Sequence, residues 1–433
     1  MSRRVEKMRR ALMRVNTRLL LSAVMLLQFA AFALAAFRGE SVSVQTLVFA
    51  AAVPLATMLV TVLASKLWPI DRAILILVLF LLSIGLITLS AVAKSEVTPR
   101  THAIYAFAGL FAMLFGAWFI RKWKTWKKYA PYLAILCMIA LLTPYLPKIG
   151  VYKGGARNWI QIIPNKLTIQ PSEFMKPILI VVLASGFSNR PRFLRCIPTL
   201  AFAAICCGIL LSERDLGAVL LYFLTTVFMY YAATSNALLT LAGLGMGCGA
   251  AVIAYNSFEY VRDRIAIWQN PWIDPQNTGY QLVQSLIAIG SGGLFGMGLG
   301  LGSPTKVPLY HSDFIFASIA EEFGLIFAVG LLAIYAIIVL RGLIVAMNAR
   351  TSFHSLVSFG LVILLGLQTM LIVGGTTKLL PLTGVTLPLV AYGGSSLVSS
   401  CLSMGILLGI SSMNAEDEAK DIERIALTEE TEM

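Results

Sequence analysis

The chain has 433 residues, of which 58% are hydrophobic and only 13% are charged. An ordinary soluble domain carries about 25% charged residues, so this composition excludes a water-soluble protein and indicates that lipid surrounds the chain. The net charge of +13 is spread over several short segments. A nucleic-acid-binding protein gathers its basic residues on one soluble face, so this distribution argues against nucleic-acid binding.

About twelve windows are apolar enough to cross a hydrocarbon core of about 30 Å as helices. In chain order they cover 19–37, 45–65, 73–93, 103–120, 130–146, 174–187, 196–211, 216–233, 236–255, 314–340, 354–374 and 394–412. Helices satisfy their own backbone polar groups in lipid, and the strand periodicity of a membrane barrel is absent from the sequence. The sequence therefore predicts an all-α polytopic membrane protein with about twelve spans.

Basic residues cluster in short links between spans, which the positive-inside rule places in the cytoplasm. The clusters lie at 3–18, 121–128, 190–195 and 341–350. Both termini are then expected to be cytoplasmic, with a basic segment over 1–18 and an acidic tail over 414–433. That tail is either a solvated terminus or a brief charged helix. We expect the first apolar window to be retained, because no convincing A-x-A-type cleavage site follows it.

With this orientation the long loops 147–173, 256–313 and 375–393 lie outside the membrane. The loop over 256–313 is too long to be a mere connector. Its first part has apolar residues at helical spacing near Ile287, and its second part is rich in glycine over 290–302. The string GMGLGLG is not read as a dinucleotide site, because a strand before it and a helix after it are not predicted. We expect a flexible or re-entrant segment over the membrane surface.

The cysteines and histidines do not form a recognisable metal or triad pattern. The six cysteines fall in predicted helices without metal spacing, so we interpret them as small apolar packing residues; they are Cys137, Cys196, Cys206, Cys207, Cys248 and Cys401. A Ser-His-Asp triad cannot be assembled from the three histidines His102, His311 and His354.

Asp313 lies in the string HSDFIFASIAEEFG, where the long loop meets the next span. A carboxylate between a low-dielectric floor and water has a raised pKa and is able to act as a base. Aspartate is also a preferred N-cap residue, so an equal alternative is that Asp313 caps the helix beginning at Phe314. Glu321 and Glu322 follow in that helix, about 100° apart. We expect at least one of them to face the interior and meet a cation or backbone group.

The outer loop over 147–173 contains four basic residues, although basic residues are usually found on the cytoplasmic side. The four are Lys148, Lys153, Arg157 and Lys166. Their presence outside suggests an anionic ligand such as a phosphate or pyrophosphate group. Glu173 and Lys176 follow at i, i+3, a spacing that predicts a local ion pair.

Two further pairs of charged residues lie in the outer loops, near the ends of predicted helices. Arg214 and Asp215 either pair with each other or bind the ligand. Arg262 and Arg264 are either phosphate contacts or anchors for lipid head groups. The sequence alone leaves both alternatives open.

Several long strings together resemble one family. They are GARNWIQI (155–162), QPSEFMK (170–176), RDLGAVLLY (214–222), NPWIDPQNTGYQLVQSLIAIGSGGLFGMGLG (270–300), HSDFIFASIAEEFG (311–324) and LPLTGVTLPLVAYGGSS (380–396). In this order they are similar to the SEDS proteins (shape, elongation, division and sporulation), the RodA/FtsW/SpoVE type. The resemblance covers about residues 71–413.

The resemblance implies a ten-helix core over 71–413 with a large extracytoplasmic loop at 256–313, and makes 19–70 an extra transmembrane hairpin. Family members are peptidoglycan glycosyltransferases that polymerise lipid II into glycan strands on the outer face of the bacterial cytoplasmic membrane. The implied partners are lipid II, the growing glycan strand, membrane lipids and a class B penicillin-binding protein, the transpeptidase, without nucleic acid. Elongation, division and sporulation members share these strings, so the process served stays open.

The resemblance also implies roles for particular residues. Asp313 matches the essential aspartate of the family's H-[ST]-D-F string, which favours catalysis by Asp313 as general base over capping. The implied substrate-binding residues are Arg157, Trp159, Glu173, Lys176, Arg214, Asp215, Gln284, His311, Lys378 and Ser395. A divalent cation, Mg or Mn, is the expected cofactor, with no organic cofactor, and the sequence does not identify the ligands of that metal.

The chain departs from the family pattern at three places in the core. Asn158 stands where arginine often precedes the tryptophan, Leu309-Tyr310 replaces a Pro-Glu pair, and Ile372 replaces an asparagine. Two alternatives remain beside the transferase. A lipid II flippase predicts a charged pathway to the cytoplasmic side, whereas the mid-span positions are nearly all apolar. A degenerate scaffold predicts the loss of Asp313, which is present.

Overall fold

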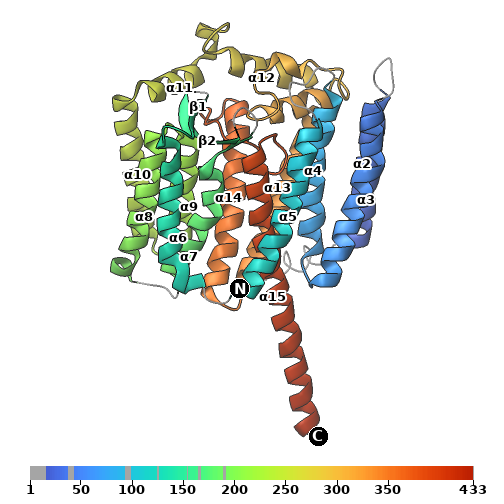
Figure 1. Ribbon diagram of the computed structural model, residues 1–433, viewed down its shortest axis with the longest axis vertical. Coiled ribbons are helices and arrows are strands. Elements are labelled where there is room, and N and C mark those ends of the chain that lie inside the picture. Colours follow the sequence, from blue (N-terminus) through green and yellow to red (C-terminus); the bar gives the residue numbers. More distant parts are fainter. Residues whose placement is uncertain are drawn as a thin grey trace.

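The structure is a computed structural model that describes residues 16–37, 43–92, 99–123, 126–153, 155–163, 167–188 and 192–432. Most of the predicted basic segment 1–18 lies outside these residues, as do Lys166 and Arg190. The chain forms a helical bundle (Figure 1). We call the end that carries segments 143–170, 258–314 and 377–393 the loop end, and the opposite end, where the last helix leaves the bundle, the tail end.

Each predicted span coincides with a helix of the bundle. The helices are α2 (Thr17–Ala36), α3 (Val44–Leu67), α4 (Arg72–Ala91), α5 (Pro99–Lys122), α6 (Trp126–Leu142), α7 (Pro171–Phe187), α8 (Phe193–Ser212), α9 (Leu216–Thr234), α10 (Ala237–Ser257), α13 (Ile315–Asn348), α14 (Ser352–Thr376) and α15 (Gly394–Glu432). Within the described ranges, 11 helices are long and apolar enough to cross a membrane, and α7, with 17 residues, is not among them. The predicted all-α polytopic membrane fold is confirmed.

Helices α2 and α3 form a hairpin at one edge of the bundle, coloured blue in Figure 1. Gln28 on α2 donates its amide to Thr57 Oγ1 on α3 at 3.1 Å. The hairpin packs against α4, and almost every residue of α4 is buried. Asp71 caps α4 by accepting the backbone N–H groups of Ala73 and Ile74. The hairpin therefore covers a helix that would otherwise lie at the edge of the bundle.

The loop end contains a small sheet that the sequence analysis did not predict. Strands β1 (Gly150–Lys153), β2 (Ala156–Ile163) and β3 (Leu167–Ile169) are antiparallel in the order β1-β2-β3. Val151 lies opposite Trp159, and Ile160 lies opposite Ile169. Cross-strand pairs of β-branched and aromatic residues favour such a ribbon. The loop also holds the short helices α11 (Glu259–Gln269) and α12 (Tyr280–Gly292), as the helical spacing near Ile287 indicated.

The glycine-rich segment after α12 is hydrogen-bonded to α13, so the flexible alternative of the predicted flexible or re-entrant segment is corrected. Helix α13 is interrupted at Gly324, whose φ of 86° and ψ of 168° are non-helical. Backbone groups freed at this break pair with the glycine-rich segment: Met297 donates to Glu321 O at 2.8 Å, and Leu325 donates to Gly293 O at 2.9 Å. The glycine-rich segment supplies hydrogen-bond partners to the backbone groups that the break leaves unpaired. In a membrane such groups have no water to bind, so they need partners within the protein.

Glu321 also takes part in this contact. Its side chain is buried and its Oε1 accepts the backbone N–H of Ser303 at 2.9 Å. The expectation that one acid of the Glu321–Glu322 pair meets a backbone group is therefore confirmed.

Helix α15 continues without a break from the bundle into the acidic tail, which projects away from the tail end (Figure 1, red). The tail is thus helical, which is one of the two predicted alternatives. Its first turns are tied to the bundle by ion pairs: Arg121 lies 2.7 Å from Glu416, and Arg350 lies 3.5 Å from Asp417. Deeper in the bundle, Arg341 binds both carboxylate oxygens of Asp71.

Candidate active site

Asp215 is a hub for hydrogen bonds at the loop end. As the N-cap of α9, its Oδ1 accepts the backbone N–H of Ala218 at 3.0 Å. Its Oδ2 accepts the amides of Asn158 at 2.8 Å and Gln170 at 3.0 Å, and the hydroxyl of Ser172 at 3.5 Å. The carboxylate thereby joins strand β2 and the start of α7 to the first turn of α9.

Arg214 does not pair with Asp215 in the described structure, so that alternative is wrong. The backbone of Arg214 has a φ of 64°, which directs its side chain away from the following residue. The guanidinium lies over the ring of Tyr260 at 5.5 Å and donates to the hydroxyl of Tyr152 at 3.3 Å. Arg214 therefore lies at the outer rim of the loop end rather than against the acid.

Asp313 lies in the turn that precedes α13. The N-cap of that helix is Phe314 and its first residue is Ile315, so Asp313 lies one residue outside the capping position proposed as its alternative role. The segment after α14 packs against the turn: a Cβ placed on Gly384 would lie 3.9 Å from Asp313 Oδ2. The same segment meets the start of α9, where a Cβ on Gly217 would touch Thr383 and Val385. Segment 383–385 thus lies between Asp313 and the start of α9.

Arg264 on α11 lies within electrostatic reach of both acids. Burial lowers the pKa of Arg264, and the negative charges of Asp215 and Asp313 oppose this shift. Its Nη1 donates to Leu382 O at 3.4 Å. Arg262, two residues earlier, is exposed and donates to Asn256 O at 3.0 Å. Residues two apart on a helix point to nearly opposite sides, so Arg264 faces the acids and Arg262 faces away from them.

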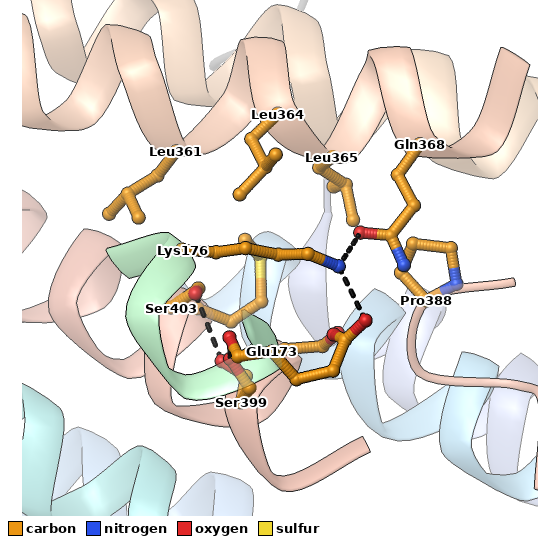
Figure 2. Close-up of a pocket in the computed structure, with 11 residues that line it drawn as sticks. Glu173, Lys176, Leu361, Leu364, Leu365, Gln368, Pro388, Ser399 and Ser403 are labelled. Carbon is orange, nitrogen blue, oxygen red and sulfur yellow. Dashed lines mark hydrogen bonds and ion pairs between the residues drawn. The ribbon is translucent and has the colours of Figure 1, made fainter. Parts of the chain in front are cut away.

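A second polar layer lies deeper in the bundle. Glu173 is in the first turn of α7, which Pro171 begins, and its Oε1 lies 2.7 Å from Lys176 Nζ. Lys176 also donates to Gln368 Oε1 at 3.2 Å. Figure 2 shows the three polar groups converging between leucines of α14 and serines of α15. Both charged side chains are buried, so the predicted i, i+3 ion pair is present, while its role in substrate binding stays a prediction.

The two layers are connected through the segment after α14. Gln368 Nε2 donates to Thr386 O at 2.9 Å, and Thr386 donates its hydroxyl to Ser396 at 2.6 Å. The cavity beside Lys176 has a volume of about 20 Å³, which holds about one water molecule. It is too small for a sugar.

The chain matches the family model described as cell cycle protein, of the FtsW/RodA/SpoVE type, over residues 66–416. The chain belongs to this family. It is 34% identical over 368 residues to the peptidoglycan glycosyltransferase RodA of Mycobacterium tuberculosis, and the alignment covers 79% of this chain and 78% of that protein. It is 33% identical over 362 residues to the stage V sporulation protein E of Bacillus subtilis, with 79% and 96% covered.

Solved structures of the family share the fold. One is a chain of a peptidoglycan synthase complex, whose structure addresses the coordination of polymerization and crosslinking. It matches with a TM-score of 0.68 and 25% identity, and the match covers 80% of this chain and 98% of that chain. The rod shape determining protein RodA of Thermus thermophilus matches with a TM-score of 0.59 and 25% identity, covering 79% and 96%.

The structure shows what this member has at its departures from the family pattern. Asn158 contacts Asp215 directly. Leu309 adopts a φ of 56°, which a proline cannot take, and Tyr310 is buried with its ring 5.2 Å from that of His311. Ile372 is part of the apolar core of α14. The departures are therefore accommodated by local packing.

The other residues predicted to bind substrate are divided between the site and its surroundings. Ser395 Oγ accepts the backbone N–H of Gln170, next to the Asp215 hub. The indole Nε1–H of Trp268 donates a hydrogen bond to the backbone carbonyl of Lys378 at 3.1 Å. Lys378 has a φ of 63°. Arg157 donates to the carbonyls of Pro144 and Tyr145 and lies over the Tyr145 ring.

Three predicted residues remain to be placed. His311 lies in the Asp313 turn. Trp159 is in β2, opposite Val151, and Gln284 is half-buried on α12. The structure thus places Ser395 next to the Asp215 hub and His311 in the Asp313 turn, while Arg157 contacts the backbone of its own loop.

Glu213 is a buried acid that the sequence analysis did not single out. It follows α8, and its backbone carbonyl accepts the N–H of Arg157 at 3.0 Å. Burial, aided by the charge of Asp215, raises the pKa of Glu213 to about 9. Its Oε1 has no hydrogen-bond partner within the described part of the chain. The only signal in the sequence was an acid two residues before Asp215.

Among the described residues, no group of three His, Cys, Asp or Glu side chains is arranged to hold a metal. These residues therefore do not provide a complete set of ligands for the expected divalent cation. Asp215 already accepts four hydrogen bonds. Mg²⁺ often binds through one or two carboxylates and takes its remaining ligands from water and substrate phosphates.

Proposed function

We propose that this protein is a peptidoglycan glycosyltransferase that polymerises lipid II into glycan strands. The names of its relatives support this activity. The observation that carries the proposal is the position of Asp313, which lies in the turn before α13 and, like Asp215, is within electrostatic reach of Arg264. The reaction requires a base and a nearby positive charge.

In the reaction, the 4-hydroxyl of one lipid-linked disaccharide attacks the anomeric carbon of another sugar chain, and a lipid pyrophosphate leaves. Asp313 accepts the proton of the attacking hydroxyl, a contribution of about 10²–10⁴-fold in rate. Arg264 stabilises the negative charge that develops on the leaving pyrophosphate, because guanidinium groups bind phosphate oxygens with charge-assisted hydrogen bonds. Arg214 at the rim is placed to attract the pyrophosphate.

A divalent cation fits this scheme when the substrate supplies part of its coordination. Pyrophosphate oxygens and water would supply most of the ligands of the ion, which leaves Asp313 free to accept the proton. The ion would supply additional positive charge to the leaving group.

The active site is proposed to face outward from the cytoplasmic membrane. The basic residues Arg121, Arg341 and Arg350 lie at the tail end, which the positive-inside rule assigns to the cytoplasm. The loop end then lies outside, with the lipid tails of the substrate between helices. A class B penicillin-binding protein is the proposed partner, in keeping with the peptidoglycan synthase complex of the structural relative.

The proposal is tested by polymerisation of labelled lipid II by purified protein with its class B partner. Asp313→Asn is nearly isosteric and removes the base, so the rate should fall about 10²–10⁴-fold while the melting temperature stays unchanged. Asp263→Asn, an exposed acid on α11, is the matched control and should polymerise normally. Normal polymerisation by the Asp313→Asn variant would overturn the assignment. A lipid II flippase would form no glycan strands in this assay.

A further inference from the structure

Tyr392 lies where three aromatic or imidazole rings from two other parts of the chain meet. Its ring centroid is 6.2 Å from that of His102 and 5.8 Å from that of Tyr105, both on α5. It is 5.6 Å from that of His311 at an interplanar angle of 74°. The backbone N–H of Tyr392 also donates to His311 O at 2.8 Å. One residue thus joins α5 to the turn that carries Asp313.

His102 supports this stack from within the bundle. Its side chain is fully buried, and neither ring nitrogen has a hydrogen-bond partner among the residues that the structure describes. Its Nε2 would lie 3.0 Å from a Cβ on Gly85, so α4 closes over it. An ionisable side chain at membrane depth is costly and usually serves a function. The ring contact of His102 with Tyr392 connects it to the turn that carries Asp313.

The two turns joined by Tyr392 and His311 are both strained. Leu309 has a φ of 56° and Leu389 a φ of 66°, in the left-handed region that disfavours side chains with a Cβ. Such conformations persist only where surrounding contacts hold them, and they gather at functional sites. The His311–Tyr392 contacts join the two turns and are among the contacts available to hold them.

We propose that Tyr392 is a positioning residue, which with His102 behind it fixes the 309–314 turn and so places the Asp313 carboxylate relative to Arg264. The catalytic part of this inference rests on the proposed role of Asp313 as the base. Tyr392 acts through its ring and its backbone. Burial and the neighbouring Tyr105 raise the pKa of its phenol to about 12, so the phenol stays protonated and neutral near neutral pH.

The kinetic test compares Tyr392→Phe with Tyr392→Leu in lipid II polymerisation. The phenylalanine keeps the stacked ring and should retain activity within about threefold, whereas leucine should lower kcat about 10–100-fold with little change in KM, as expected for a misplaced catalytic group. Phe111→Leu, on the exposed face of α5, is the control and should be neutral. Normal kcat in Tyr392→Leu, or equal loss in Tyr392→Phe, would overturn the proposal.

A structural readout separates this proposal from the role of Asp313. Hydrogen exchange of residues 309–314 should be faster in Tyr392→Leu than in wild type and unchanged in Tyr392→Phe. This measurement holds even if Asp313 proves not to be the base. If Tyr392→Leu does not fold, His102→Leu against His102→Phe gives the same comparison from α5, with faster exchange expected only for leucine. Unchanged exchange in folded ring-deleting variants would show that the stack does not hold the turn.

Discussion

The side-chain amide of Asn158 donates a 2.8 Å hydrogen bond to Asp215 Oδ2, joining strand β2 to the first turn of α9. Both side chains are buried. Where the family pattern often has arginine, this chain holds the acid with a neutral amide. The positive charge of Arg264 on α11 lies within electrostatic reach of Asp215.

We expect Asn158→Ala to destabilise the protein by about 1.5–3 kcal/mol, because it removes a hydrogen bond to a buried carboxylate. Thermal unfolding in detergent measures the effect. Asn277→Ala is the matched control, since Asn277 donates to Asp274 at 3.0 Å on an exposed loop, and its loss should cost less than about 1 kcal/mol. Equal destabilisation by the two variants would contradict the structural role of Asn158.

Arg264 is expected to contribute to pyrophosphate binding. Arg264→Gln should lower kcat/KM for lipid II about 10–100-fold, because it removes a charge-assisted interaction with the leaving pyrophosphate. Arg262→Gln removes the same charge from the exposed side of α11 and should change kcat/KM less than about twofold, since exposed charges are screened by salt. If both variants lower kcat/KM equally, the effect is one of net charge and not of the Arg264 position.

The buried pair of Lys176 and Glu173 predicts a non-additive pair of substitutions. Lys176→Met leaves the Glu173 carboxylate buried without its cation and should cost about 3–5 kcal/mol. The double variant Glu173→Gln with Lys176→Met removes both charges and should recover much of that loss. Melting temperatures of the single and double variants measure the coupling. Additive effects would show that the ion pair does not stabilise the fold.

The spans were predictable because bilayer thickness alone sets the length of an apolar window. The Glu173–Lys176 pair was predictable because i, i+3 spacing places two side chains on one helical face. The sheet β1-β2-β3 was missed because strand pairing depends on partners and is weakly encoded in short loops. The electrostatic influence of two acids on Arg264 was not predictable, since it depends on how distant loops meet. The predicted Arg214–Asp215 pairing was wrong because the Arg214 guanidinium contacts Tyr260 and Tyr152 instead.

Glu213 gives the stability a pH dependence of known sign. Its pKa is about 9 in the folded protein against an ordinary value of 4.5, so the folded state keeps a proton that the unfolded chain releases. Stability from this group is fully present below pH 4.5 and is lost as pH rises toward 9, by up to about 1.4 kcal/mol per unit. The melting temperature of Glu213→Gln should therefore fall less with rising pH between pH 5 and 9 than that of wild type. Glu259→Gln, an exposed acid, should follow wild type.

The break in α13 predicts opposite results for two glycines in one helix. Gly324 has a φ of 86°, and a Cβ there would lie 2.4 Å from the backbone nitrogen of Gly296. Gly324→Ala should therefore cost more than about 3 kcal/mol or prevent folding, because it combines left-handed strain with a clash against backbone. Gly330 is exposed and its Cβ would meet no atom within 4 Å, so Gly330→Ala should be neutral or stabilising by up to about 1 kcal/mol. Expression level and melting temperature of the two variants measure this difference. A Gly324→Ala variant as stable as Gly330→Ala would mean that the glycine-rich segment does not pack against α13 in the membrane.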